Sequence, residues 1–227
     1  MSVLNSHNEW DKLKEVIVGT SKKSFPVITW RKNYSLKRSI LDEVKKIAQQ
    51  VHQSGSPYGY VSMGSTIICT VLAYISVGGM DPKQATEDFY FLQKLAKYDK
   101  IHQIDEILVH PSARQEQRVY LGTGYRLKNI ANQPLFSDLQ FNQKAFQDLC
   151  FIYSTIKENW DCSLDYIQVV FIKYNCKIWT YFINNDFDEV FYKIKKNTKN
   201  QKQFINQFNY WFDNLKIYKF LKMYAQI

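Results

Sequence analysis

The sequence predicts an α/β fold, a mixed central sheet flanked by helices and followed by a C-terminal helical tail. Stretches of apolar, β-branched residues alternate with segments whose apolar residues recur at helical spacing. The 227 residues, 45% hydrophobic and 22% charged, are enough for one sizeable core and too few for two comfortable domains. Residues 104–114 are typical of a central strand, since an apolar run ends at Pro111 and turns into a basic, amide-rich segment.

The first half of the chain supplies the elements that lead to this strand. A short strand is expected at residues 14–19, and a helix at 35–53 with apolar residues at helical spacing. Residues 58–63 and 66–77 are interpreted as two strands, the second apolar on both faces and therefore in the middle of a sheet. A helix over 82–97 follows, because an Asp-Pro pair is typical of a helix start.

In the second half of the chain, predicted strands and helices alternate as well. Residues 141–160 give the clearest helical pattern, 165–172 and 189–194 are interpreted as strands, and 174–183 as a short helix. The aromatic and lysine-rich tail, residues 197–227, has amphipathic spacing and is expected to form one or two helices. We therefore predict a domain over 1–196 and a helical extension over 197–227 that packs on it.

The composition limits the cell compartments and the classes of partner that we expect. No apolar run reaches the roughly 18 residues of a membrane span, and the acidic first twenty residues are unlike a signal peptide, so we expect a cytoplasmic protein. Four scattered cysteines without a Cys/His cluster favour free thiols and predict no metal site. The net charge of +9, concentrated in residues 12–46 and 193–222, suits nucleic acid, an acidic protein or a phosphate-bearing cofactor, and equally a solvated surface.

Two local motifs and the order of elements resemble the GNAT acyltransferases. The motif V-H-P-S-A-R at residues 109–114 is similar to the V-x-P-x-x-R that joins the family's central strand to its donor-binding turn. The stretch NCKIWTYFINNDF at 175–187 is similar to a second family motif that begins with Asn and ends with Gly-Phe. Together these similarities cover residues 66–190, and they imply a GNAT-like mixed sheet flanked by helices.

Within that family the chain looks closest to the acyl-carrier-dependent N-acyl amino acid synthases and acyl-homoserine-lactone synthases. The resemblance implies transfer of a fatty acyl group from an acyl carrier protein or coenzyme A thioester to the amine of a small molecule. Glu106, which stands where these enzymes carry an acidic residue, is our candidate for the proton acceptor. Tyr181, the neighbour of the position where the family has its tyrosine, is our candidate for the donor to the leaving thiolate. Acyl-phosphopantetheine or acyl-coenzyme A would be the donor substrate, with no permanently bound cofactor, and an acidic carrier protein the expected partner. The residues that it places at the donor are Leu108, Val109, Arg114, Gln117, Arg118, Val119 and Asn175.

Several positions depart from the family pattern and keep other functions open. Gln115, Gln117 and Val119 stand where the phosphate turn has glycines, and Phe182 stands at the usual tyrosine. A catalytically silent GNAT-like binding module is therefore the first alternative, and a basic nucleic-acid-binding protein is another, although the resemblance favours an acidic protein partner over nucleic acid. The N-terminal residues NEWDKLKEVIVG also resemble the first strand of the glycine/arginine amidinotransferases. A protein related to these enzymes is therefore a minor third alternative.

Overall fold

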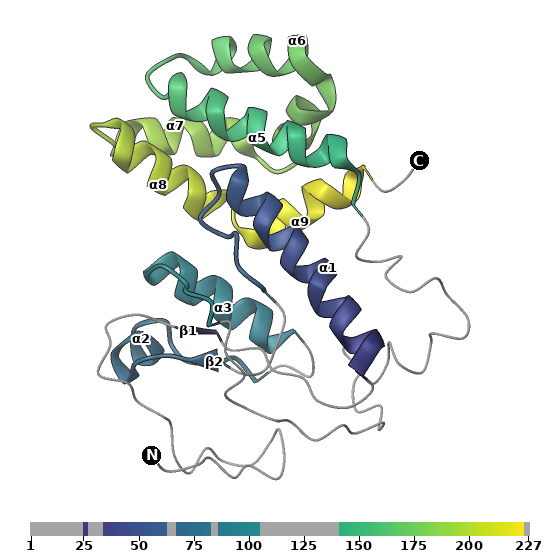
Figure 1. The fold of residues 1–227 in the computed structure, drawn as a ribbon. Coiled ribbons are helices and arrows are strands. Elements are labelled where there is room, and N and C mark those ends of the chain that lie inside the picture. The colour runs from purple at the N-terminus through teal and green to yellow at the C-terminus, as the bar shows by residue number, and fades with distance from the viewer. Residues whose placement is uncertain (1–24, 27–33, 63–66, 83–85, 105–140, 225–227) are drawn as a thin grey trace. The chain divides into compact units, whose positions relative to one another are not determined.

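The computed structural model describes residues 25–26, 34–62, 67–82, 86–104 and 141–224 of the chain, and these are mostly helical (Figure 1). Helices make up 70% of them and strands 3%. Strands in this part are the antiparallel two-residue pair β1 (Phe25–Pro26) and β2 (Ile67–Ile68). The predicted GNAT-like α/β fold with a central sheet is therefore wrong, although most of the strand predicted at 104–114 lies outside the described residues.

The chain divides into two compact units. The first comprises residues 1–45 and 60–137, and the second comprises residues 46–59 and 138–227. Helix α1 (Tyr34–Gln53) contributes to both units. In its described part the first unit contains β1, β2, α2 (Val71–Ser76) and α3 (Glu87–Tyr98). The domain boundary predicted at residues 196 and 197 falls within the second unit.

The second unit is a bundle of helices. After α1 and a short turn, its described helices are α5 (Gln143–Glu158), α6 (Leu164–Ile183), α7 (Phe187–Asn197), α8 (Gln201–Trp211) and α9 (Asn214–Met223). The helix predicted at 141–160 is present as α5, and the tail, where one or two helices were expected, forms α8 and α9. The helix predicted at 35–53 is confirmed as α1.

Helix α6 replaces a predicted strand at 165–172 and a predicted helix at 174–183. Ser163 caps its start, since the serine side chain accepts a hydrogen bond from the backbone N–H of Tyr166. The buried residues Ile167, Phe171 and Ile178 recur at helical spacing. A short apolar run does not separate a buried strand from a buried helix by itself, and here the cap and the length of the segment decide for the helix.

The other predicted strands are also corrected. Thr70 caps α2 by accepting a hydrogen bond from the N–H of Ala73, so the long apolar run at 66–77 becomes β2 followed by a short helix. Residues 189–194 lie within α7, which buries Phe187, Phe191 and Ile194 at a helical spacing of four and three. Residues 58–62, the described part of the first predicted strand of that pair, have no regular secondary structure.

Aromatic rings fill the core of the second unit. Phe182, at the end of α6, is fully buried, and its ring centroid lies 5.2 Å from Phe171, 4.7 Å from Phe187 and 5.4 Å from Trp211. Burying one large apolar side chain contributes roughly 1.5–3 kcal/mol. The fully buried phenylalanines of this core are Phe171, Phe182, Phe187, Phe191, Phe204, Phe208, Phe212 and Phe220. They hold α6, α7, α8 and α9 together.

The turn after α1 is fastened to this bundle by hydroxyl groups. The Tyr58 hydroxyl donates to the backbone carbonyl of Asn209 in α8 at 2.8 Å. The Tyr153 hydroxyl, from α5, donates to Oγ of Ser56 at 3.0 Å. Gly59 lies so close to α1 that a Cβ there would meet the backbone of His52 at 2.4 Å, and only glycine fits. The end of α1 is therefore an integral part of the second unit.

Candidate functional site

Of the site residues predicted from the sequence, Tyr181 and Asn175 lie in the described part of the chain, both in α6. The proposed proton acceptor, Glu106, lies outside the described residues, so its role stays a prediction. The same holds for the other residues placed at the donor, which are Leu108, Val109, Arg114, Gln117, Arg118 and Val119.

Tyr181 is a buried residue whose hydroxyl is engaged with the backbone. Its OH donates to the carbonyl of Lys216 in α9 at 2.7 Å, and its ring packs edge-on against Phe220 at 5.2 Å. Burial raises the pKa of this hydroxyl, and the carboxylate of Asp213 raises it further. In this arrangement Tyr181 joins α6 to α9.

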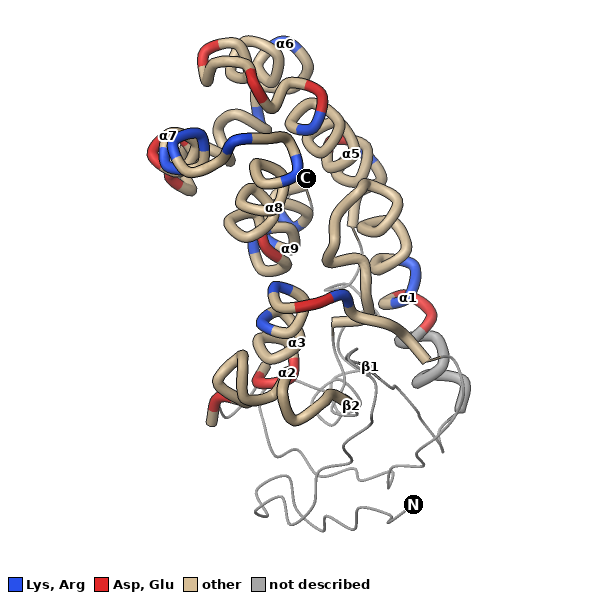
Figure 2. The backbone as a smooth tube through the Cα atoms, turned by 90° about the vertical axis from the view of Figure 1, so that its left-hand side faces the viewer, with Lys and Arg blue, Asp and Glu red and all other residues tan. Residues whose placement is uncertain are grey.

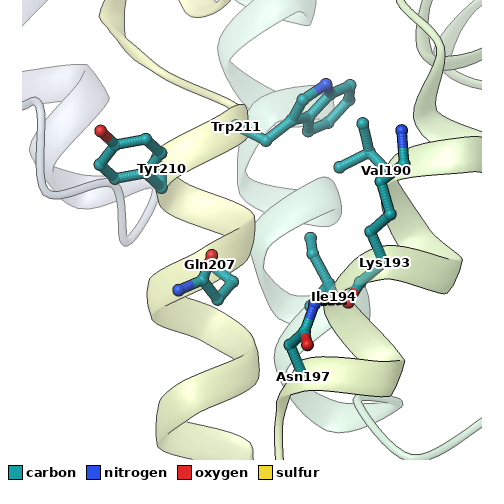
Figure 3. Close-up of a pocket in the computed structure, with 7 residues that line it drawn as sticks. All are labelled: Val190, Lys193, Ile194, Asn197, Gln207, Tyr210 and Trp211. Carbon is teal, nitrogen blue, oxygen red and sulfur yellow. Dashed lines mark hydrogen bonds between the residues drawn. The ribbon is translucent and has the colours of Figure 1, made fainter.

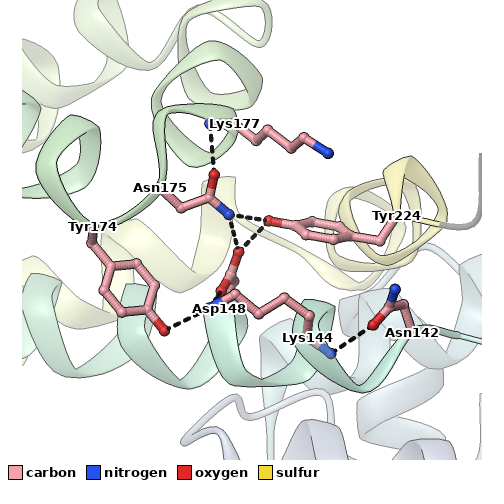
Figure 4. Close-up of polar contacts among 7 residues, drawn as sticks. All are labelled: Asn142, Lys144, Asp148, Tyr174, Asn175, Lys177 and Tyr224. Carbon is pink, nitrogen blue, oxygen red and sulfur yellow. Dashed lines mark hydrogen bonds and ion pairs between the residues drawn. The ribbon is translucent and has the colours of Figure 1, made fainter. Parts of the chain in front are cut away.

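Asn175 interrupts α6 and begins its second half. Its backbone is extended, with φ −160° and ψ 108°, and its Oδ1 accepts a hydrogen bond from the N–H of Lys177 at 3.1 Å (Figure 4). This is the bond that an N-cap residue makes. Its Nδ2 donates to the Tyr224 hydroxyl at 3.1 Å and to Oδ2 of Asp148. Asn175 therefore ends one helical segment, caps the next and ties both to neighbouring helices.

Asp148 is the centre of this polar network. It is fully buried in α5 and accepts hydrogen bonds from Asn175 and from the Tyr224 hydroxyl of the α9 C-cap, while Lys144 Nζ lies 2.9 Å from its Oδ1 (Figure 4). The hydrogen bond to Asp148 raises the pKa of Lys144, and burial followed by the same carboxylate raises the pKa of Tyr224. A buried carboxylate is costly unless it is paired and hydrogen-bonded. Here both conditions hold, so the network fixes α5, α6 and α9 to one another.

A second charged region has the opposite character. We call α7 and α8, with the turn between them, the basic hairpin; the two helices pack against each other. Residues 187–211, which form the hairpin, contain five lysines and two acids, Asp188 and Glu189. The overlapping segment 193–222, which runs on into α9, contains eight lysines and one acid, Asp213, a formal charge of +7 (Figure 2). Asp213 is buried and caps α9 by accepting a hydrogen bond from the N–H of Lys216 at 3.2 Å. Within 193–222 the lysines therefore have no exposed acid, and the nearest one in sequence is Glu189 of α7, beside Lys193.

Three of the eight lysines serve the fold. Lys195 donates to the carbonyl of Trp160 at 2.9 Å and lies over nearby aromatic rings. Lys193 lies 3.4 Å from the Glu189 carboxylate, in a pair that is exposed and therefore weak. Lys216 lies over the ring of Trp211. Lys195 and Lys216 thus contact other parts of the bundle, whereas Lys193 pairs within α7.

The other five lysines are exposed, and none of them makes an ion pair within the described residues. Lys196, Lys199 and Lys202 follow one another at intervals of three residues around the turn of the basic hairpin, and we call these three the lysine turn. The remaining two, Lys219 and Lys222, lie one helical turn apart on α9. Lysines near the end of a helix interact favourably with its dipole, which explains Lys196 and Lys222 but not Lys199 or Lys202.

A shallow groove of about 210 Å³ runs between the two helices of the basic hairpin (Figure 3). Its apolar floor combines Val190 and Ile194 of α7 with the partly exposed ring of Trp211 of α8. Four polar residues complete it: Lys193, Asn197, Gln207 and Tyr210. In the close-up, the Tyr210 ring points away from α7, so Trp211 is the aromatic ring that faces the groove.

Each helix of the basic hairpin also carries an exposed tyrosine ring. Tyr192 of α7 is 62% exposed, and Tyr210 of α8 is 61% exposed. Tyr192 precedes Lys196 by four residues in the same helix, so the two share one face of α7. Exposed rings interleaved with unpaired cations are the groups that bind a nucleic-acid backbone and stack on its bases. The sequence had shown the lysine excess in 193–222; which lysines stay unpaired required the structure.

Two other classes of site find no support in the described part of the chain. No group of three or more His, Cys, Asp and Glu side chains there is arranged to hold a metal ion. None of the helices described combines the length and apolar character that a bilayer crossing requires.

Comparison of the chain with family models, curated proteins and solved structures finds no match. Its function must therefore be argued from the geometry of its own residues.

Proposed function

We propose that this protein binds nucleic acid through the basic hairpin. The observation that carries the proposal is the lysine turn, where Lys196, Lys199 and Lys202 are exposed and make no ion pair within the described residues. Phosphates are the natural counter-ions of such a cluster, because each lysine that neutralises a phosphate releases a condensed counter-ion. Tyr192 adds an exposed ring on the face that carries Lys196.

The other lysines of residues 193–222 support nucleic-acid binding by contrast with the lysine turn. Lysines that stabilise the bundle have visible partners, as Lys195 has in the carbonyl of Trp160. The acid of the segment, Asp213, is committed to the N-cap of α9 and leaves the exposed lysines without internal compensation. The exposed acids of the hairpin, Asp188 and Glu189, lie in the first turn of α7, at the end of that helix away from the lysine turn. A local excess of one charge raises the rate of association with an oppositely charged partner. A polyanion is the partner that matches it.

An acidic protein is the second partner that these lysines would suit, because complementary charge steers protein association as well. It would accommodate the acyl carrier protein expected from the sequence, and with it acyl transfer to a small-molecule amine in the cytoplasm. We rank this second, since its proton acceptor, Glu106, lies outside the described residues and the sheet that it requires is not formed by them. Release of free thiol from an acyl-carrier or coenzyme A thioester in the presence of amines tests it.

The test of nucleic-acid binding compares two triple variants of the full chain with equal loss of charge. One replaces Lys196, Lys199 and Lys202 by Gln. The control replaces exposed lysines outside the basic hairpin by Gln, namely Lys100, Lys157 and Lys173. Binding of a fluorescent 12-nucleotide strand is followed by anisotropy as a function of salt concentration.

We expect the lysine-turn variant to lose about two from the slope of log K against log salt, since each phosphate contact with a single strand contributes about 0.7. The control should keep the slope of the natural protein to within about one contact. Equal slopes for the two variants, or an unmodified protein that does not bind the strand, would refute the proposal.

A further inference from the structure

The groove of the basic hairpin lies beside the lysine turn. Asn197, at the last residue of α7, lines the groove, and Lys196 and Lys199 flank it in sequence. A strand whose phosphates contact the lysine turn therefore passes close to Asn197, one of the residues that line the groove. The cavity volume of about 210 Å³ is below the roughly 300 Å³ at which sites for drug-sized ligands begin, which suits one small planar group.

The polar groups of the groove are available for hydrogen bonding. Gln207 is exposed, and its amide has no partner within the described residues, so it presents both a donor and an acceptor. Asn197 uses its Nδ2 to donate to the carbonyl of Lys193 at 2.8 Å, which fixes the side chain and leaves Oδ1 as an acceptor. The edge of a nucleobase carries donors and acceptors of these two kinds.

The apolar side of the groove is held rigid by the core. The Trp211 ring packs against Phe187 at 4.9 Å and Phe182 at 5.4 Å between ring centroids. Lys216 Nζ lies 5.6 Å from its centroid, which brings a further cation to the same ring. An aromatic surface that is fixed in advance costs little ordering when a base packs on it.

We propose that the groove is a nucleobase subsite and that the ligand of the basic hairpin is single-stranded nucleic acid. This rests on the proposed function and adds to it the class of nucleic acid. A base in a duplex is stacked and paired and does not enter a groove of this size, whereas a base of a single strand turns outward at small cost. Phosphates contact the lysine turn, and one base lies between Trp211 and the amides of Asn197 and Gln207.

The experiment measures binding of the full chain to three 12-nucleotide strands of equal phosphate number. These are oligothymidylate, oligouridylate and a strand of abasic deoxyribose phosphates. A duplex of the same length is the fourth ligand. Oligothymidylate and oligouridylate distinguish DNA from RNA, and the abasic strand removes the bases while it keeps the charge.

We expect at least one base-bearing strand to bind about fivefold more tightly, or better, than the abasic strand, because stacking of one base on an aromatic ring accounts for at least this much. It should also bind more tightly than the duplex. Gln207→Ala should reduce the preference over the abasic strand by about two- to tenfold through the lost hydrogen bonds. Gln147→Ala, on an exposed face of α5, is the matched control and should change nothing.

Trp211 requires a milder change because it also belongs to the core. Trp211→Phe keeps an aromatic ring against Phe187 and should lower the preference for bases while circular dichroism shows the helices intact. Equal affinity for abasic and base-bearing strands, with binding still dependent on the lysine turn, would refute the subsite and leave the proposed function standing. Failure of the unmodified protein to bind any of the four ligands would refute both.

Discussion

The Asp148 network and the lysine turn lie in the same helical unit and treat charge in opposite ways. Asp148 is fully buried, and its oxygens are contacted by Asn175, Tyr224 and Lys144. The lysines at 196, 199 and 202 are exposed, and within the described residues they make no ion pair. Charges that hold this fold together therefore have partners inside it. Charges without a partner are the ones to assign to a ligand.

The buried tyrosine hydroxyls of the helical unit should give the largest change in the free energy of unfolding, and they should do so at alkaline pH. Burial raises the pKa of Tyr58, Tyr153, Tyr181 and Tyr224 in the folded protein. In the unfolded chain they ionise near the ordinary value of about 10. Above that pH the unfolded state binds fewer protons than the folded state, so stability falls as the pH rises.

At pH 11 this loss amounts to about 1.4 kcal/mol for each of these four tyrosines, or about 6 kcal/mol together. Urea unfolding at pH 8, 9, 10 and 11, followed by circular dichroism, measures it. A free energy of unfolding that stays constant across that range would show that these hydroxyls are not buried in the folded protein.

Asp148→Ala should give the next largest effect, a loss of about 3 kcal/mol in the free energy of unfolding. The substitution leaves the Tyr224 hydroxyl and the Asn175 amide without their acceptor, and each buried polar group left without a hydrogen bond costs about 1–3 kcal/mol. Asp161→Ala, at an exposed acid without a described partner, is the control and should stay within about 0.5 kcal/mol. Equal urea midpoints for the two variants would contradict the structural role of Asp148.

Tyr224→Phe should cost less, about 1.5–3 kcal/mol, because it removes one hydrogen bond to a charged group and keeps the ring. The ring still packs against Phe220, whose centroid lies 5.5 Å away. Tyr192→Phe removes an exposed hydroxyl and serves as control. Thermal unfolding of both variants gives the comparison, and a Tyr224→Phe protein as stable as the natural one would mean that Asp148 does not depend on this hydroxyl.

The lysine turn should affect stability least, although it should affect nucleic-acid binding most. Replacing Lys196, Lys199 and Lys202 by Gln should change the free energy of unfolding by no more than about 0.5 kcal/mol, since exposed lysines without partners contribute little to a fold. The urea midpoint of this triple variant checks the point. A loss above about 2 kcal/mol would mean that these lysines have structural partners and would undo the comparison.

The sequence predicted long amphipathic helices correctly and short apolar segments poorly. Residues 141–160 show one apolar face over four turns, and α5 lies there. In α6 that signal is blurred, because Val169 and Ile172 are apolar and yet exposed, and because Asn175 breaks the helix in the middle. The alternation of Val190, Tyr192 and Ile194 has the period of a strand, whereas the buried Phe187 and Phe191 reveal a helix only once the bundle is known.

For the basic hairpin, composition identified the lysine-rich stretch of the chain but not which of its lysines have partners. The excess of lysine in residues 193–222 is visible in the sequence. That Lys195 is used by the carbonyl of Trp160 while Lys199 and Lys202 remain unpaired depends on contacts between residues far apart in the chain. Asn175 was predicted at a donor site from a resemblance, and in the structure it caps the second half of α6.

Contact between nucleic acid and the basic hairpin is best tested by mapping where a bound strand lies on the protein. Amide chemical shifts of the isotope-labelled full chain are recorded with and without the single-stranded 12-mer that binds best. We predict the largest shift changes in residues 190–211, above all at Lys196, Lys199, Lys202 and Gln207, and little change around Asp148. Shift changes that leave this segment untouched while the strand is bound elsewhere would contradict the account.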